Sequence, residues 1–283
     1  MRRGKGYALA HARDQLAGDP PDVAIIIDAD CRISAGGIDR LAAVALAADR
    51  PVQAAYLLAP RRSAGPMVQL SGFAFLVKNL VRQRGLARIG APAILTGSGM
   101  AFPWAILAEA PLATGDIVED LGLGIALASA GHAPIFCADV TIWSDPSSAT
   151  GTLEQRRRWE LGFLDTARSK ALPLLRSGRW GRSWLGLHLL VPPLALLMMV
   201  DGLLLAVLAI VAGLGGPILP LLVLAGLLAF ALSLVGIVWA GHGRDQIRAA
   251  TLLRIPLYML WKLPIYLDAI TRRERRWVRT RRD

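Results

Sequence analysis

Two aspartates one residue apart, Asp28 and Asp30, directly follow the apolar run "VAIII" at residues 23–27. Such a run favours a central strand covered on both faces, and ligands of open α/β sheets bind at the carboxyl ends of such strands. Side chains two residues apart on a strand point to the same side, and two close carboxylates are unfavourable unless a cation joins them. Oxygen ligands suit Mg²⁺ or Mn²⁺ held against a diphosphate. Because Asp-x-Asp is also common in surface turns, this interpretation needs support from other residues.

A second cluster, "QRRRW" at residues 155–159, places Gln155, Arg158 and Trp159 at i, i+3 and i+4 of a predicted helix. These three side chains share one helix face. That face offers an amide, a guanidinium for diphosphate oxygens and an indole on which a sugar ring can stack. Arg156 and Arg157 are expected to contact solvent or lipid headgroups. The same pattern also fits an amphipathic helix on a membrane surface.

Three shorter motifs could complete such a site: "KGYAL" from residue 5, "TGSG" from residue 96 and "VED" from residue 118. Lys5 could reach phosphates, or it could be a solvated lysine at a helix start. Gly97 and Ser98 could bring backbone amides close to a sugar, or they could form an ordinary turn. Glu119 and Asp120 could work as an acid or a base, or they could merely stabilise a helix start.

Alternating strands and helices must position these motifs, which favours an α/β domain in roughly residues 1–168. Strands are expected at 23–30, 51–59 and 134–143, with a strand or loop over 91–99 that breaks at its glycines. Helices are expected at 5–17, 36–48, 67–84, from about 103, and at 115–132 and 152–168.

The chain is 54% hydrophobic, and the excess lies in residues 183–243, which contain no lysine or arginine and a single acid, Asp201. The glycine-rich turn "GLGGP" divides this stretch into two apolar segments, about residues 185–212 and 218–240. Each segment is long enough to cross a bilayer core of about 30 Å. We therefore predict a two-helix transmembrane hairpin. Asp201 is either a functional acid within the first span or a headgroup-level residue near its outer end.

The net charge of +11 flanks this hairpin on both sides. Residues 154–182 carry eight basic and three acidic residues, and residues 244–283 carry eleven and four, whereas the "GLGGP" turn carries none. This is the positive-inside pattern of a hairpin with both ends in the cytoplasm. The expected partners of the basic flanks are anionic membrane lipids, and no nucleic acid is needed to explain the charge.

The two cysteines, Cys31 and Cys137, have no spacing typical of zinc sites and are expected to be reduced and buried. The N-terminus is charged and contains no apolar core typical of a signal peptide. After the predicted hairpin, the prolines and charges of residues 241–283 favour an amphipathic interfacial segment with a basic cytoplasmic tail.

In their order and spacing, "KGYAL", "DAD", "TGSG", "ED" and "QRRRW" resemble the membrane-bound, processive branch of the family 2 glycosyltransferases. This branch has the GT-A fold and includes cellulose, chitin and hyaluronan synthases. The resemblance spans most of residues 5–165, and the predicted hairpin fits the same family. It implies a partial GT-A-like mixed sheet with flanking helices, followed by the hairpin and the basic tail.

The resemblance also implies a role for each motif. Asp30 would hold the divalent cation, and Asp28 would contact the nucleotide side. Asp120 would act as general base on the acceptor hydroxyl, which implies inversion at the anomeric carbon. The remaining assignments concern contacts with the two substrates. They are Lys5, Gln155 and Arg158 for the nucleotide diphosphate, and Gly97, Ser98, Glu119 and Trp159 for the acceptor.

These observations predict an inverting glycosyltransferase of the inner or plasma membrane that depends on Mg²⁺ or Mn²⁺. Its donor would be a nucleotide sugar, with a UDP-sugar as the first expectation, and its acceptor a saccharide or a lipid-linked molecule. The alternative is a catalytically silent, membrane-anchored subunit that binds a partner. The predicted divisions are a glycosyltransferase portion at 1–170, a basic linker or interfacial helix at 171–184, the hairpin at 185–240 and the tail at 241–283.

Only four residues precede Lys5, whereas the family places its first strands and its nucleotide-base pocket before this motif. The strand at residue 23 would then leave an apolar edge open, which natural sheets avoid. We therefore expect either a longer natural chain or a second polypeptide that completes the site, and little activity from these 283 residues alone.

Overall fold

The computed structural model of the protein describes residues 4–60, 63–146 and 149–271. The described chain forms two compact units. Within the described residues, the first, here called the sheet unit, comprises residues 4–59, 74–146 and 149–190. The second, the hairpin unit, comprises residues 60, 63–73 and 191–271.

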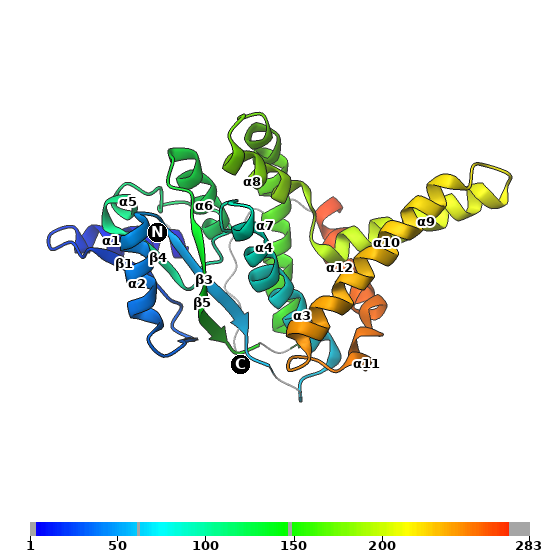
Figure 1. Ribbon diagram of the computed structural model, residues 1–283, viewed down its shortest axis with the longest axis horizontal. Coiled ribbons are helices and arrows are strands. Elements are labelled where there is room, and N and C mark those ends of the chain that lie inside the picture. Colours follow the sequence, from blue (N-terminus) through cyan, green and yellow to red (C-terminus); the bar gives the residue numbers. More distant parts are fainter. Residues whose placement is uncertain (1–3, 61–62, 147–148, 272–283) are drawn as a thin grey trace. The chain divides into compact units, whose positions relative to one another are not determined.

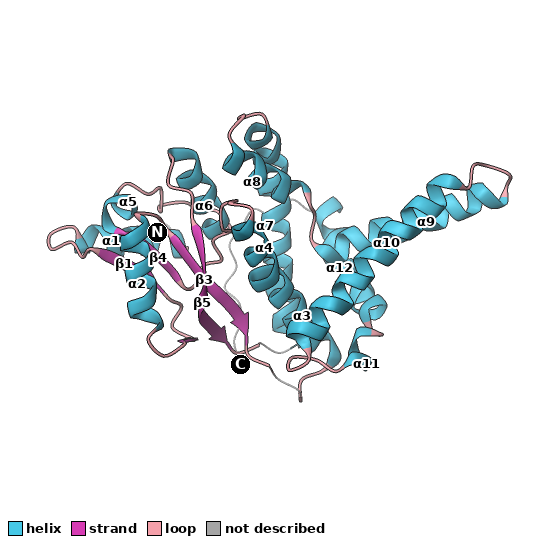
Figure 2. Ribbon diagram, viewed as in Figure 1, coloured by secondary structure: helices cyan, strands magenta, loops and turns pink. Residues whose placement is uncertain are grey.

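A five-stranded mixed sheet forms the centre of the sheet unit (Figures 1 and 2). Its strands are β1 (Val23–Ile26), β2 (Cys31–Ile33), β3 (Val52–Leu58), β4 (Met100–Pro103) and β5 (Ile135–Ser144). Their order is β1-β4-β3-β5-β2, in which β3 and β5 are parallel and the other pairs are antiparallel. The mixed sheet expected from the sequence is therefore confirmed.

The sequence analysis predicted a central strand at residues 23–27, and this detail is wrong. Strand β1 lies at an edge of the sheet. Its apolar run has another cause. Val23, Ile25 and Ile27 pack against one core cluster, whereas Ala24 and Ile26 pack against another. Both faces of the strand are covered although only one side is paired in the described chain. An apolar run in the sequence thus indicates that both faces of a strand are covered, but it does not distinguish an edge strand from a central one.

Strand β3 forms the centre of the core, since all seven of its residues are buried. Helix α2 (Gly37–Ala48) packs across the sheet and contacts β1, β3, β4 and β5 (Figure 1). Its buried positions Leu41 and Ala45 are one helical turn apart, and both join the core cluster that contains β3. The spacing of four residues produces the single apolar stripe that a helix needs to cover a sheet.

The other helices of the sheet unit follow the predicted order, with small shifts at their ends. They are α1 (Lys5–Leu16), the π-helical turn Val77–Val81, α4 (Arg82–Arg88), α5 (Trp104–Ala108), α6 (Glu119–Ala130), α7 (Ala149–Leu175) and α8 (Trp180–Leu190). Residues 91–99 form a loop that leads into β4. Helix α7 continues past the expected boundary at residue 170, and Ala171, Leu174 and Leu185 share a core cluster with α6. The predicted linker at 171–184 is therefore part of the packed sheet unit.

The hairpin unit contains two long apolar helices, α9 (Leu194–Gly213) and α10 (Leu219–Val238), that pack against each other. The spans Leu194–Gly213 and Leu219–Gly243 are long and apolar enough to cross a membrane, and they are the two such helices among the described residues. Only 11% of the first and none of the second is buried within the protein. Asp201 lies in α9 and is half-buried.

The first apolar helix begins at Leu194 and not at residue 185. Residues 185–190 belong to α8, and the chain breaks at Pro192 and Pro193 before α9 starts. The proline pair causes this break because proline disfavours helix in the residue before it and suits a helix start. The remaining helices of this unit are α3 (Pro66–Leu76, which continues into the sheet unit), the π-helical turn Trp239–Gly243, α11 (Ala249–Leu252) and α12 (Ile255–Thr271). Residues 272–283 of the predicted tail lie outside the described residues.

Candidate active site

A cleft of about 1050 Å³ in the sheet unit brings most of the predicted site residues together. Its walls come from the start of α1, the turn after β1, the loop before β4, the start of α6, the end of β5 and α7. The predicted residues that line it are Lys5, Asp28, Asp30, Gly97, Glu119, Asp120, Gln155, Arg158 and Trp159. Segments from distant parts of the sequence thus meet at one cavity.

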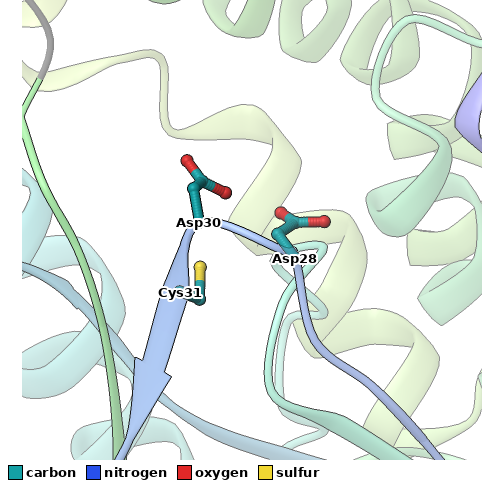
Figure 3. A group of neighbouring side chains, drawn as sticks. All are labelled: Asp28, Asp30 and Cys31. Atoms are coloured by element: carbon teal, nitrogen blue, oxygen red, sulfur yellow. The ribbon is translucent and has the colours of Figure 1, made fainter.

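Asp28 and Asp30 lie in the turn that follows β1, and Cys31 begins β2. The candidate ligand atoms of these three residues all lie within 4.8 Å of one another. Figure 3 shows both carboxylates pointing to the same side of the chain. Burial is the main reason why the pKa of the Cys31 thiol is raised. The group therefore contains two carboxylates, whose hard oxygen atoms fit Mg²⁺ or Mn²⁺.

Lys5 connects three of the predicted motifs. Its Nζ donates to Asp28 Oδ1 at 2.5 Å and to the Gly97 carbonyl at 2.6 Å. The ion pair compensates the charge of Asp28, whereas the Asp30 side chain is exposed. Because an ammonium group has three N–H donors, a contact between Lys5 and a bound phosphate stays a prediction.

The "TGSG" loop is fixed from behind by a residue that the sequence analysis missed, the fully buried Gln53 of β3. Gln53 Nε2 donates to the Ser98 carbonyl, and its Oε1 accepts from the Thr96 N–H, both at 2.9 Å. Ser98 is also fully buried, and its Oγ accepts from the Asp28 N–H at 3.1 Å. This geometry favours a positioning role for Ser98 over the predicted acceptor contact. The available signal for Gln53 was a lone amide within the apolar strand "VQAAYLL".

Asp120 lies near the start of α6, where its Oδ1 accepts from the Leu121 N–H at 2.8 Å. Burial raises the pKa of Asp120, and the opposing influences are the Leu121 N–H, Lys78 and Lys5. Burial also raises the pKa of Glu119, with the charge of Asp120 as the second cause. A carboxylate with a raised pKa is a stronger base, so the direction of this shift favours Asp120 as a proton acceptor.

Gly97 lies against this carboxylate, and Gly97→Ala should lower turnover by roughly tenfold or more through displacement of Asp120. A Cβ on Gly97 would lie 3.2 Å from Asp120 Oδ2 and 3.6 Å from Lys5 Nζ. Gly90→Ala is the matched control, because both glycines have positive φ, +85° and +66°, but a Cβ on Gly90 would have no neighbouring atom within 4 Å. Turnover and thermal unfolding of the two variants should be compared. Equal turnover of the two would show that the contact with Asp120 is unimportant.

Gln155, Arg158 and Trp159 line the cleft from α7, as their spacing predicts. The Trp159 ring stacks on Phe75 with centroids 5.6 Å apart and planes at 26°. The Nε of Arg158 is buried and has no hydrogen-bond partner among the described residues. The helix therefore presents an available guanidinium to the cleft, together with an indole that already has one aromatic partner.

Arg156 departs from the expected contact with solvent or headgroups, because it is buried at 8% exposure. Its guanidinium carbon lies 5.0 Å from the ring centroids of both Phe75 and Trp159. These cation–π contacts stabilise an otherwise unfavourable buried cation. Helix α7 is thus packed into the sheet unit at this position.

The sequence analysis also missed other residues of the cleft walls, among them Tyr56, Ser144, Lys78 and His188. The Tyr56 and Ser144 hydroxyls are hydrogen-bonded at 3.0 Å. For Lys78 the available signal was a lysine within the apolar stretch "FAFLVKNLV". His188 lies in an apolar segment that the sequence analysis assigned to a membrane span, and for this reason a role for His188 in the cleft was not predicted.

The sequence model described as Glycosyl transferase family group 2 matches residues 23–240. The chain belongs to this family. It is therefore a glycosyltransferase, and the family 2 membership expected from the five motifs is confirmed. The predicted GT-A-like fold class is also confirmed, as a mixed sheet with flanking helices and two apolar helices.

No curated protein matches this chain. Among solved structures, the chain is similar to a mannosyltransferase from Pyrobaculum calidifontis in complex with GDP-Man and Mn²⁺. The identity is 17%, the TM-score is 0.48, and the match covers 96% of this chain and 68% of that one. The assignment to the family depends on the sequence match, and the roles of individual residues depend on the geometry of the cleft.

Proposed function

We propose that this glycosyltransferase moves a sugar, with inversion, from a nucleotide sugar to a saccharide or lipid-linked acceptor at the cytoplasmic face of a membrane. A UDP-sugar is the proposed donor. The observation that supports this most strongly is the common cleft. It joins Asp28 and Asp30 to Asp120 and to the Gln155–Arg158 face of α7.

On the donor side, Arg158 and Gln155 bind diphosphate oxygens. Asp30 would hold a divalent cation, and Asp28 contacts the nucleotide side. Two carboxylates within 4.8 Å of each other support such a site. Mg²⁺ or Mn²⁺ bound there would stabilise the negative charge that develops on the leaving nucleoside diphosphate. The buried, unpartnered Nε of Arg158 supports the diphosphate contact, since guanidinium groups bind such oxygens well.

In the transfer step, ionised Asp120 accepts the proton of an acceptor hydroxyl. The hydroxyl oxygen forms a bond to the anomeric carbon, and the bond from that carbon to the diphosphate oxygen breaks. The electron pair of the broken bond leaves with the nucleoside diphosphate. Because one displacement occurs opposite the leaving group, the anomeric configuration inverts.

On the acceptor side, Trp159 stacks on a sugar ring, while Gly97 lets backbone atoms approach it closely. Glu119 lies beside Asp120 in the cleft wall and binds an acceptor hydroxyl. The raised pKa of Glu119 makes its carboxyl easier to protonate than an exposed one, so it can donate as well as accept a hydrogen bond.

A panel of nucleotide sugars tests the function directly. Membranes that contain the chain should release nucleoside diphosphate from one donor, and the release should require a divalent cation and increase with added acceptor. Membranes with the Asp120→Asn variant provide the background rate. Release that is equal in both preparations for every donor would contradict the proposed function.

We further propose that α9 and α10 cross the membrane with both flanks in the cytoplasm, and we predict the labelling pattern that follows. The basic residues before and after the hairpin support this orientation. In a background without Cys31 and Cys137, Leu214→Cys at the turn should react with a membrane-impermeant maleimide added to intact cells. Arg179→Cys should react only after the cells are opened. The opposite pattern, or labelling of Arg179→Cys in intact cells, would refute the orientation.

A further inference from the structure

One part of the cleft is basic and has no task in the proposed mechanism. Lys78 comes from the π-helical turn Val77–Val81, and His188 comes from α8. Both line the cleft. Arg82, the first residue of α4, is not a lining residue of the cleft, but its Nη2 donates to the His188 carbonyl at 3.4 Å. We call Lys78, Arg82 and His188 the basic subsite. π-Helical turns often occur at functional positions.

His188 is a buried polar side chain without a polar partner. It is 4% exposed, and neither Nδ1 nor Nε2 has a hydrogen-bond partner in the described part of the chain. Its ring packs edge-on against Phe163, with centroids 5.8 Å apart. An unpaired polar group in a protein interior is unfavourable, because it has lost its hydrogen bonds to water. A bound ligand that pairs with the ring would remove this cost.

Lys78 is a cation with no matching acid. Its side chain is exposed to the cleft, and within the described chain no carboxylate lies at ion-pair distance from its Nζ. Although this side chain keeps access to water in the cleft, the surrounding protein lowers the pKa of Lys78 by desolvation, and Arg156 and Arg82 lower it further. Burial also lowers the pKa of Arg82 to about 10. Desolvated cations that repel one another create a favourable place for an anion.

Lys78 and His188 share the cleft with Asp120, the proposed base. Asp120 is the acid that most raises the pKa of Lys78, and Lys78 in turn lowers that of Asp120, so the two side chains interact. An anion bound by Lys78 and His188 would therefore occupy the same cleft as the proposed base.

We propose that Lys78, Arg82 and His188 bind a phosphate group of the acceptor while a hydroxyl of the same acceptor reaches Asp120. This inference deepens the proposed function and rests on it for the assignment of the acceptor side. The ligand class is a phosphorylated acceptor. Its phosphate belongs either to a polyprenyl carrier or to a soluble sugar phosphate, and the phosphate chemistry that the subsite recognises is the same.

Direct binding tests this proposal without any turnover. The full chain, in phosphatidylcholine nanodiscs with EDTA and no nucleotide sugar, is titrated by calorimetry with farnesyl phosphate and with glucose 6-phosphate. Farnesol and glucose are the phosphate-free counterparts. We expect one phosphate probe to bind at least tenfold more tightly than its counterpart. A preference for farnesyl phosphate identifies a lipid carrier, and a preference for glucose 6-phosphate identifies a soluble acceptor.

Lys78→Gln should weaken binding of that probe by about tenfold or more, because charged hydrogen bonds contribute roughly 1.5–3 kcal/mol. Lys170→Gln is the matched control, since Lys170 is an exposed lysine of α7 that does not line the cleft. Its binding should equal that of the parent. Lys78 is exposed to the cleft, so its replacement should not disturb packing.

His188→Phe separates ligand binding from simple core packing. The ring would still pack on Phe163, but it could not donate to a phosphate, so affinity should fall several-fold while the melting temperature stays at or above that of the parent. Parent-like affinity in Lys78→Gln, or no phosphate-specific binding by the parent chain, would overturn the proposal. Phosphate binding by a chain that transfers no sugar would instead contradict the proposed function alone.

Discussion

Asp120→Asn should lower the turnover of sugar transfer by about 10² to 10⁴, the usual contribution of a general base. The amide preserves the size of the side chain but cannot accept the proton of the acceptor hydroxyl. Its Oδ1 can still accept from the Leu121 N–H, so the start of α6 should stay intact. Nucleotide binding should therefore be nearly unchanged. The measurement is turnover with saturating donor and acceptor, together with a nucleotide titration.

Asp116→Asn is the control for this variant, because Asp116 is an exposed acid in the loop before α6 and does not line the cleft. The pH profile adds a second readout. Only ionised Asp120 accepts a proton, so the parent rate should fall as the pH drops through the pKa of this group. That pKa is raised above the ordinary value of 3.8. The same limb should be missing from the residual rate of Asp120→Asn. Turnover within tenfold of the parent would exclude Asp120 as the base.

Asp30→Ala should abolish the increase in UDP affinity that Mn²⁺ produces in the parent chain. The reason is that Asp30 supplies an exposed carboxylate next to Asp28, whose own charge is already compensated by Lys5. Calorimetric titrations of UDP with and without Mn²⁺ measure the difference. Transfer should be lost together with the metal dependence.

Asp19→Ala removes an exposed acid outside the cleft and should keep the full effect of Mn²⁺. This control excludes a general effect of net charge on nucleotide binding. If Asp30→Ala retained the same ratio of affinities with and without Mn²⁺ as the parent, Asp30 would not be the metal ligand.

The elements of the fold could largely be predicted from periodicity, but their neighbours in the sheet could not. The apolar run at residues 23–27 indicates a strand with two covered faces, which β1 is. Its place at the edge depends on pairing with β4, which lies more than seventy residues later. Local sequence carries no signal for a pairing at that separation. The end of α8 was likewise not predicted, because it lies within an apolar stretch, although Pro192 and Pro193 indicate a break there.

The cleft residues could be predicted where a motif carried several polar groups, as at residues 155–159. Isolated polar residues that belong to no motif were harder to predict from the sequence. Ser98 and Gln53 hold the loop from within the core, and Arg156 finds its partners in Phe75 and Trp159. His188 is a single polar residue between leucines. Such roles depend on which segments meet in space, so they required the structure.

The stereochemistry of the product tests the central claim most directly, because a single displacement assisted by one base permits only inversion. The first glycosidic bond formed from an α-linked nucleotide sugar should be examined by proton NMR before any further turnover. The account predicts a β-linked product from the parent chain and no such product from Asp120→Asn. An α-linked product would contradict it, since retention requires a mechanism other than one displacement assisted by Asp120.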